Sequence, residues 1–255
     1  MNPILRKEMR SLLRERRGWL VPGLYGALLA GIVAVVCQTT AYAVIDPQRM
    51  AVEAAMVVAV LQTIVVALIA PILGAASIAS ERERGTWTRL LAAPIARSQI
   101  AVGKLAATGM YIVVLLLVPL PVAALTVLFG GMDMASLSGL CTTHLLLGIT
   151  LGCVGLAVST AFHRTWVATA VAIALVATLT VTAELPALTL RTSAETPMWI
   201  ALLESLSPIR GTELFFRGDE IEHARRFWAM HFGALAALAA GAVAFATVRI
   251  RSMTE

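Results

Sequence analysis

The sequence predicts an all-α membrane protein, and its composition and charge distribution support this. Hydrophobic residues make up 59% of the 255 residues and charged residues only 14%, whereas soluble domains hold about 45–50% and about 25%. The chain contains six charge-free runs, each long enough to cross a bilayer, for which a helix needs about 20 apolar residues. The charged residues gather between these runs. We therefore expect six transmembrane helices.

The flanking charges set the limits of the expected spans. Asp133 alone separates the third run from the fourth, so their connection must be a tight turn around Gly130 and Gly131. The whole chain, 1–255, is expected to form one transmembrane domain. Its spans are expected at about 19–45, 54–80, 105–131, 134–162, 165–183 and 227–248.

The basic residues are expected to place both ends of the chain in the cytoplasm. With the N-terminus inside, the inner segments hold 14 Lys and Arg residues and the two short outer loops hold one. Lys and Arg accumulate in cytoplasmic loops, while a loop as long as 184–226 crosses largely regardless of charge. We expect an integral protein of the plasma (inner) membrane. The net charge of +5 then reflects orientation, and no nucleic-acid partner is expected.

Residues 2–17 are predicted to form a separate amphipathic helix. Asn2 is suited to cap it and Pro3 to occupy its first position. Apolar residues recur at helical spacing, which is typical of a helix that lies on the inner leaflet in contact with lipid. Alternatively, the segment only anchors the first span by its charge. The basic residues of this interfacial helix are Arg6, Lys7, Arg10, Arg14 and Arg17.

The segment 81–104, here called the coupling hairpin, is longer and more polar than a simple turn requires. Gly85 permits a sharp change of direction and Thr86 is suited to cap a short helix at about 87–93. Pro94 would end that helix. A short helix that combines Leu, Trp and charges suits docking into a groove of a soluble partner. The alternative is a solvated loop that only enforces topology.

The residues of this hairpin resemble a known family. Their order, Glu-x-x-x-Gly-Thr, then Leu-Leu, Pro, Arg and Gly-Lys, is similar to the cytoplasmic loop of ABC type-2 transporter permeases. The layout of six spans and the triplet Leu206-Ser207-Pro208 add to the likeness. Trp87 and Arg89 depart from the family, which usually has a smaller aliphatic and an acidic residue there. The matching positions are Glu81, Gly85, Thr86, Leu90, Leu91, Pro94, Arg97, Gly103 and Lys104.

The resemblance implies that 81–97 holds a coupling helix that docks on a separate ABC ATP-binding subunit. It also implies a second permease copy, in a homodimer or in a heterodimer with a similar permease. ATP and Mg would bind the partner subunit, because Leu105 follows Gly103-Lys104 without the spacing of a phosphate-binding loop. The implied docking residues are Glu81, Glu83, Arg84, Gly85, Thr86, Trp87, Leu90, Leu91, Pro94 and Arg97.

Polar residues are scarce inside the spans. No Asp, Glu, Lys or Arg falls within the six runs, whereas ion-coupled carriers hold such residues at depth. Gln62 and His144 either line a pathway or form interhelical hydrogen bonds. His223 and His231 have no further ligands nearby, so no metal site is expected. The chain also lacks the common catalytic motifs, so no catalytic residue is expected.

The long loop 184–226 contains the apolar stretch 198–203, which is too short to span a bilayer. It is expected to be either a re-entrant or interfacial helix that caps the pathway on the outer side, or part of a solvated loop that dips into the membrane.

Together these features predict a non-enzymatic permease subunit that exports a substrate with ATP hydrolysed by its partner. Two alternatives stay open. A subunit that only transmits signal or force would have no continuous cavity in its bundle. A membrane-embedded enzyme would gather polar residues at one depth.

Overall fold

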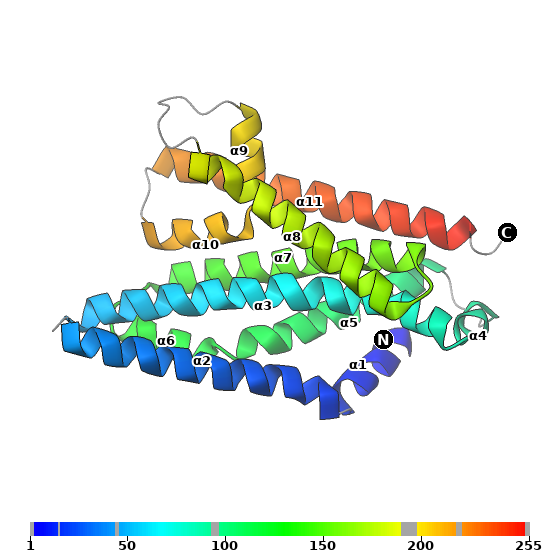
Figure 1. Cartoon of the computed structure of the whole chain (residues 1–255), viewed down its shortest axis with the longest axis horizontal. Helices are drawn as coiled ribbons and strands as arrows, with labels where there is room; N and C mark the ends of the chain where they lie inside the picture. The colour runs from blue at the N-terminus through cyan, green and yellow to red at the C-terminus, as the bar shows by residue number, and fades with distance from the viewer. Residues whose placement is uncertain are drawn as a thin grey trace.

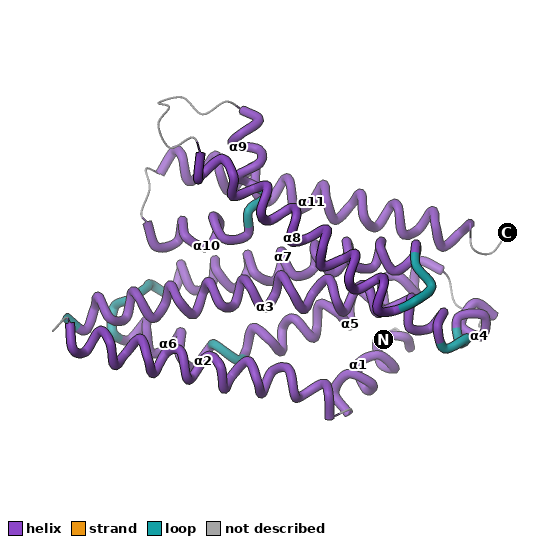
Figure 2. The backbone as a smooth tube through the Cα atoms, viewed as in Figure 1, coloured by secondary structure: helices purple, strands orange, loops and turns teal. Residues whose placement is uncertain are grey.

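The computed structural model describes residues 3–14, 16–43, 46–92, 97–189, 198–217 and 221–252, and every element in these ranges is a helix (Figure 2). This confirms the all-α fold. The helices are α1 (Pro3–Arg14), α2 (Arg16–Ala43), α3 (Pro47–Glu83), α4 (Trp87–Ala92), α5 (Arg97–Leu117), α6 (Leu120–Leu128), α7 (Met134–Ala161), α8 (Thr165–Thr189), α9 (Met198–Ser205), α10 (Pro208–Arg217) and α11 (Ile221–Ser252).

Six of these helices are long and apolar enough to cross a membrane, which confirms the expected number. They run along the long axis of the molecule (Figure 1). The helices α1 and α4 and the C-terminal part of α11 lie at one end, here called the hairpin end, and α9 and α10 lie toward the other, the loop end. The six spanning segments are Gly18–Gln38, Pro47–Glu83, Gln99–Leu117, Met134–Ala161, Thr165–Glu184 and Arg225–Ile250.

The third expected span, 105–131, is two helices in the structure. Helix α5 begins at Arg97 and ends at Leu117, and α6 follows from Leu120 after a short break. Pro119 and Pro121 explain the break, because proline donates no backbone hydrogen bond and disfavours helix at the residue before it. The expected tight turn follows α6: Gly130 has a φ of 74°, and the Asp133 carboxylate accepts a hydrogen bond from Ser136 N at 2.9 Å at the start of α7.

The centre of the bundle is the contact between α3 and α7, which lie side by side (Figure 1). Small residues let the two backbones approach closely. A Cβ added at Gly155 would meet the backbone oxygen of Pro71 and lie 2.8 Å from Ala75 N, and one added at Gly74 would lie 2.8 Å from Leu156 N. Glycine is therefore required at these positions of α3 and α7. Of the six spanning segments, α7 is the most buried.

Helix α8 packs on α3 through alanines. Ala75 and Ala79 of α3 and Ala168 and Ala172 of α8 are fully buried and form one apolar cluster. Their small side chains hold the two helices close together near the hairpin end, where α8 begins.

Candidate functional site

The coupling hairpin begins with a Schellman motif, the helix ending that closes with a glycine of positive φ. Gly85 has a φ of 66°, Gly85 N donates to Arg82 O at 3.1 Å, and Thr86 N donates to Glu81 O at 2.9 Å. The Thr86 hydroxyl also donates to Glu81 O at 3.2 Å. The side chain of Thr86 therefore closes α3, where the sequence suggested that it would cap α4. Helix α4 begins at Trp87 as expected.

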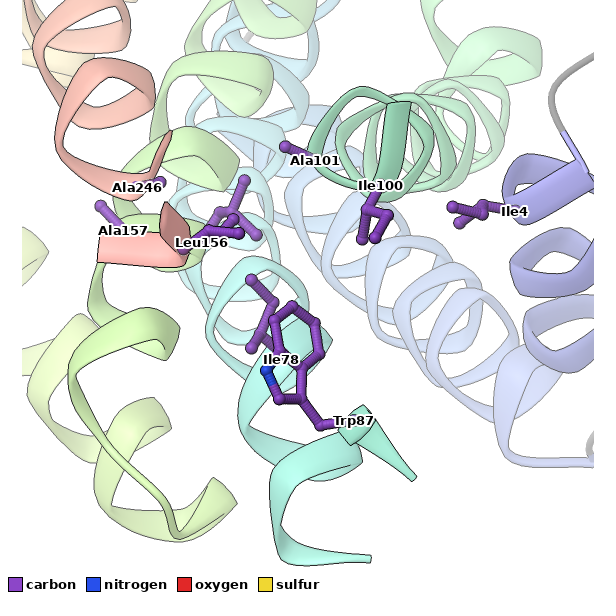
Figure 3. Close-up of a cluster of buried hydrophobic side chains, with 9 residues drawn as sticks. Ile4, Ile78, Trp87, Ile100, Ala101, Leu156, Ala157 and Ala246 are labelled. Carbon is purple, nitrogen blue, oxygen red and sulfur yellow. The ribbon is translucent and has the colours of Figure 1, made fainter. Parts of the chain in front are cut away.

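Trp87 turns inward, to the bundle. It is 7% exposed and belongs to an apolar cluster with Ile4 of α1, Ile78 of α3 and Ile100 of α5 (Figure 3). Leu90 is partly buried against the same cluster. Apolar residues of α1 and α4 thus pack on the protein itself, and the hairpin is held to three helices by apolar contacts. The other members of the cluster are Ala101, Leu156, Ala157, Ala246 and Ile250.

A buried lysine joins the two arms of the hairpin. The Lys104 ammonium lies 3.1 Å from Glu81 Oε1 and 3.1 Å from Glu8 Oε1, and it donates to Ser77 O at 2.7 Å. Its side chain is only 2% exposed. Lys7 also pairs with Glu81 Oε1 at 3.1 Å, but from the surface. This cluster links α1, α3 and α5.

Lys104 lies inside a helix, whereas the sequence placed it in the hairpin just before the span expected to begin at 105. Because α5 begins at Arg97, Lys104 falls inside the spanning segment Gln99–Leu117. Two carboxylates and one carbonyl surround its ammonium group, so the buried charge is paired, as burial of an ion requires.

The two residues that follow Glu81 bind the turn between α7 and α8. Arg82 Nη1 donates to Thr160 O at 3.1 Å and to Phe162 O at 3.4 Å, and Arg82 Nη2 lies 2.6 Å from His163 Nε2. Because a guanidinium only donates, His163 Nε2 accepts, and its ring carries the proton on Nδ1. Glu83 Oε2 accepts a hydrogen bond from Thr165 N at 3.0 Å.

The exposed part of the described hairpin is mostly polar and basic. Glu81 is buried, and Glu83 is exposed but already bonded to α8. Arg84, Gly85 and Arg89 are exposed. Outside the described part of the chain lie Pro94 and the side chains of Leu91, Arg97, Arg10, Arg14 and Arg17.

A comparison with known protein families identifies the class of this chain. The family model described as ABC-2 family transporter protein matches residues 2–249. The chain belongs to the ABC-2 transporter family. It is therefore an integral membrane protein and a membrane permease subunit of an ABC transporter, a class that works with an ATP-binding partner. No curated protein matches its sequence.

The two polar residues singled out at depth in this ABC-2 permease, Gln62 and His144, lie on the same cavity. It has a volume of about 40 Å³ and is lined by residues of α3, α6 and α7 together with Leu116, Pro119 and Met132. The Tyr25 hydroxyl donates to Gln62 Oε1 at 2.5 Å. Gln62 Nε2 is buried and has no acceptor among the described residues. Both side chains therefore face the interior between helices and also bond to neighbouring helices.

Thr63 joins three helices of the permease through its hydroxyl group. Thr63 Oγ1 donates to Ala59 O at 2.9 Å and lies 2.8 Å from His144 Nε2 and 2.7 Å from Thr212 Oγ1 of α10. A hydroxyl has one proton and two acceptor sites, so Thr63 Oγ1 can accept from His144 Nε2 and from Thr212 Oγ1, whose single proton is then shared with Pro208 O at 3.1 Å. This network holds α10 against α3 and α7. No sequence pattern indicated this network, because threonines are common in apolar helices.

Replacing Thr63 by valine is expected to loosen α10. Valine keeps the shape but leaves His144 Nε2 without its partner and removes the contact of Thr212 with α3, at a cost of about 1 kcal/mol for a hydrogen bond between membrane helices. The midpoint of thermal unfolding in nanodiscs should fall by about 2–4 °C. Thr182→Val is the control, because exposed Thr182 bonds only to carbonyls of its own helix. An equal effect of both substitutions would contradict the network.

Helix α9 covers the stretch 198–203, where the sequence predicted a helix, and α10 is a second short helix that follows it. Ser207 caps α10, because Arg210 N donates to Ser207 Oγ at 3.0 Å, and Pro208 occupies the first helical position. Ser207 Oγ also donates to Glu184 of α8. Fully buried His231 of α11 donates from Nδ1 to Ser205 O at 2.6 Å. These bonds fix the two short helices between α8 and α11.

A larger cleft lies between α3, α8 and the start of α10, here called the α3–α8 cleft. Its volume is about 270 Å³. Ile64 and Leu68 of α3 and Val181 of α8 line it and remain partly exposed. The other lining residues are Thr63, Ala67, Ile173, Val176, Ala177, Thr180, Pro208 and Ile209. The permease thus has an apolar recess between spanning helices, toward the loop end.

Proposed function

We propose that the exposed surface of the coupling hairpin docks on a separate ATP-binding subunit, and that ATP hydrolysis there drives export of a substrate through this permease. The observation that carries the proposal is the short helix α4, which projects at the hairpin end (Figure 1) while its base is fixed to α1, α3 and α5. Because α4 projects and its base is held by the bundle, a force that acts on α4 is transmitted to the bundle.

The orientation follows from charge. The hairpin end carries most Lys and Arg residues of the short connections, so we place it in the cytoplasm with both termini. That places α4 on the side of the membrane where ATP is available, with ATP and Mg held by the partner. The plasma (inner) membrane is the expected location.

The α3–α8 cleft supports a transport role. A single copy leaves this recess open beside exposed apolar residues, so a second permease copy, identical or similar, would complete the wall of a pathway. Its apolar lining suits an amphiphilic or lipid-like substrate. A subunit that only transmits signal or force needs no such recess, and the cleft therefore favours transport over that alternative.

Reversing the charge of the exposed hairpin arginines is expected to weaken the partner complex. Arg84→Glu with Arg89→Glu leaves the buried contacts of Trp87 intact, and like-charge contacts cost several kcal/mol at an interface. The affinity for the ATP-binding subunit should fall about 10-fold or more. Tagged permease is purified from its native membranes, and ATPase activity that elutes with it is measured.

Arg49→Glu is the matched control, because Arg49 is exposed on α3 near the loop end. The control should retain the ATPase. If the wild-type permease retains no ATPase, or the double variant retains as much as the control, the proposed docking surface is wrong.

A further inference from the structure

We propose that Arg82 and Glu83 are positioning residues that carry the movement of the coupling hairpin to α8, and so open and close the α3–α8 cleft. The inference rests on the proposed function. It gives these two charged side chains a role inside the subunit, whereas the sequence placed Glu83 among the residues that touch the ATP-binding partner.

The first argument is the chemistry of the two bonds. Arg82 donates to carbonyls at the C-terminal end of α7, and Glu83 accepts from the first amide of α8. Helix C-termini favour positive groups and helix N-termini favour negative ones, because the free carbonyls and amides there carry partial charges. Two adjacent residues of α3 therefore hold both ends of the α7–α8 turn, about 80 residues further along the chain.

The second argument is the packing between α3 and α8. Directly beside the turn, Ala75, Ala79, Ala168 and Ala172 bring the two helices together without a gap. Toward the loop end the same two helices part around the α3–α8 cleft. The two helices are thus in contact near the hairpin end and separated toward the loop end. This geometry allows α8 to tilt about its contact with α3 near the hairpin end.

The third argument is the position of the bonds on the chain. Arg82 and Glu83 are the last two residues of α3 and lie within the Schellman motif that connects it to α4, so a displacement of α4 reaches them before the rest of α3. Glu81 holds the other side through Lys104 of α5 and Lys7 of α1. A displacement of the hairpin therefore acts on α1 and α5 through Glu81, and on α8 through Arg82 and Glu83.

The bonds themselves are tested without any partner. Hydrogen exchange of the permease in nanodiscs is compared between wild type and Glu83→Ala, and the Thr165 amide should exchange about fivefold faster in the variant because it loses its acceptor. Glu83→Gln keeps an acceptor and should restore most of the protection. Unchanged exchange in Glu83→Ala would overturn the attachment of α8, whatever the partner does.

The transmission is tested in the complex with the ATPase. The three native cysteines are first replaced, and spin labels are then attached at Leu68→Cys and Val181→Cys. The distance between the two labels reports the width of the cleft. Trapping the partner in its nucleotide-bound state should shift this distance in the labelled wild type. The shift should be lost in Arg82→Met with Glu83→Ala, although this variant still binds the ATPase.

Arg164→Gln is the control, because exposed Arg164 lies in the same turn and its side chain acts on Glu83 through its charge alone, without a hydrogen bond among the described residues. It should keep the distance shift. A shift that persists in the double variant, or is absent in the wild type, would overturn the inference. Failure of the wild type to bind any ATPase would instead overturn the proposed function, and the exchange experiment would still decide the attachment of α8.

Discussion

Replacing Lys104 by methionine is expected to destabilise the permease by about 3 kcal/mol. Methionine fills much of the same space, but it leaves the Glu81 carboxylate buried near Glu8 with only the surface lysine Lys7 to offset it. Removing one partner of a buried ion pair typically costs about 3–5 kcal/mol, because the remaining charge stays desolvated. The expected value lies at the lower end, since Lys7 still reaches Glu81. An SDS titration in mixed micelles, followed by loss of helix packing, measures the change.

Lys7→Met is the matched control for this prediction. Lys7 reaches the same Glu81 oxygen at the same 3.1 Å, but its side chain is 63% exposed. Exposed ion pairs contribute about 0–1 kcal/mol, so the two variants should differ by at least about 2 kcal/mol. Adding Glu81→Gln to Lys104→Met should recover part of the loss. Equal effects of the two lysine variants would show that burial does not strengthen this pair.

Replacing Gly155 by alanine is expected to separate α3 from α7 and to cost about 3 kcal/mol or more, at the upper end of the range for overpacked cores. The added Cβ would meet the backbone of Pro71 and Ala75. Backbone atoms cannot change rotamer, so the helices themselves must move apart. Because α3 also carries the coupling hairpin and α7 is the most buried span, the variant should lose both stability and ATP-driven transport. The unfolding midpoint in detergent is the first measurement.

Gly233→Ala is the control for Gly155. A Cβ at Gly233 of α11 would have no neighbour within 4 Å, and alanine favours helix over glycine by about 1 kcal/mol. The control should therefore be neutral or slightly stabilising. If Gly155→Ala is equally harmless, the close contact of α3 with α7 does not exist in the membrane.

The sequence determined the class of this protein and the local form of its elements. Uncharged runs of sufficient length define six spans, because a bilayer admits only helices whose backbone groups are bonded internally. Gly85 marks where a helix ends, because backbone sterics act locally. The resemblance of the hairpin to the ABC-2 family was found from residues close together in the chain, and the family match confirms it.

Only the tertiary structure decided which side chains face inward. The sequence suggests that Trp87 is an exposed residue that docks on a partner, yet its side chain is buried against Ile4 and Ile78. The sequence suggests that Lys104 is a hairpin residue, yet it lies buried in α5 with Glu8 and Glu81 as partners. Partners that lie dozens of residues apart leave no local pattern, because the periodicity of a helix shows which residues share a face and not what that face meets. The sequence thus located the coupling hairpin, and the packing of distant helices fixed what holds it.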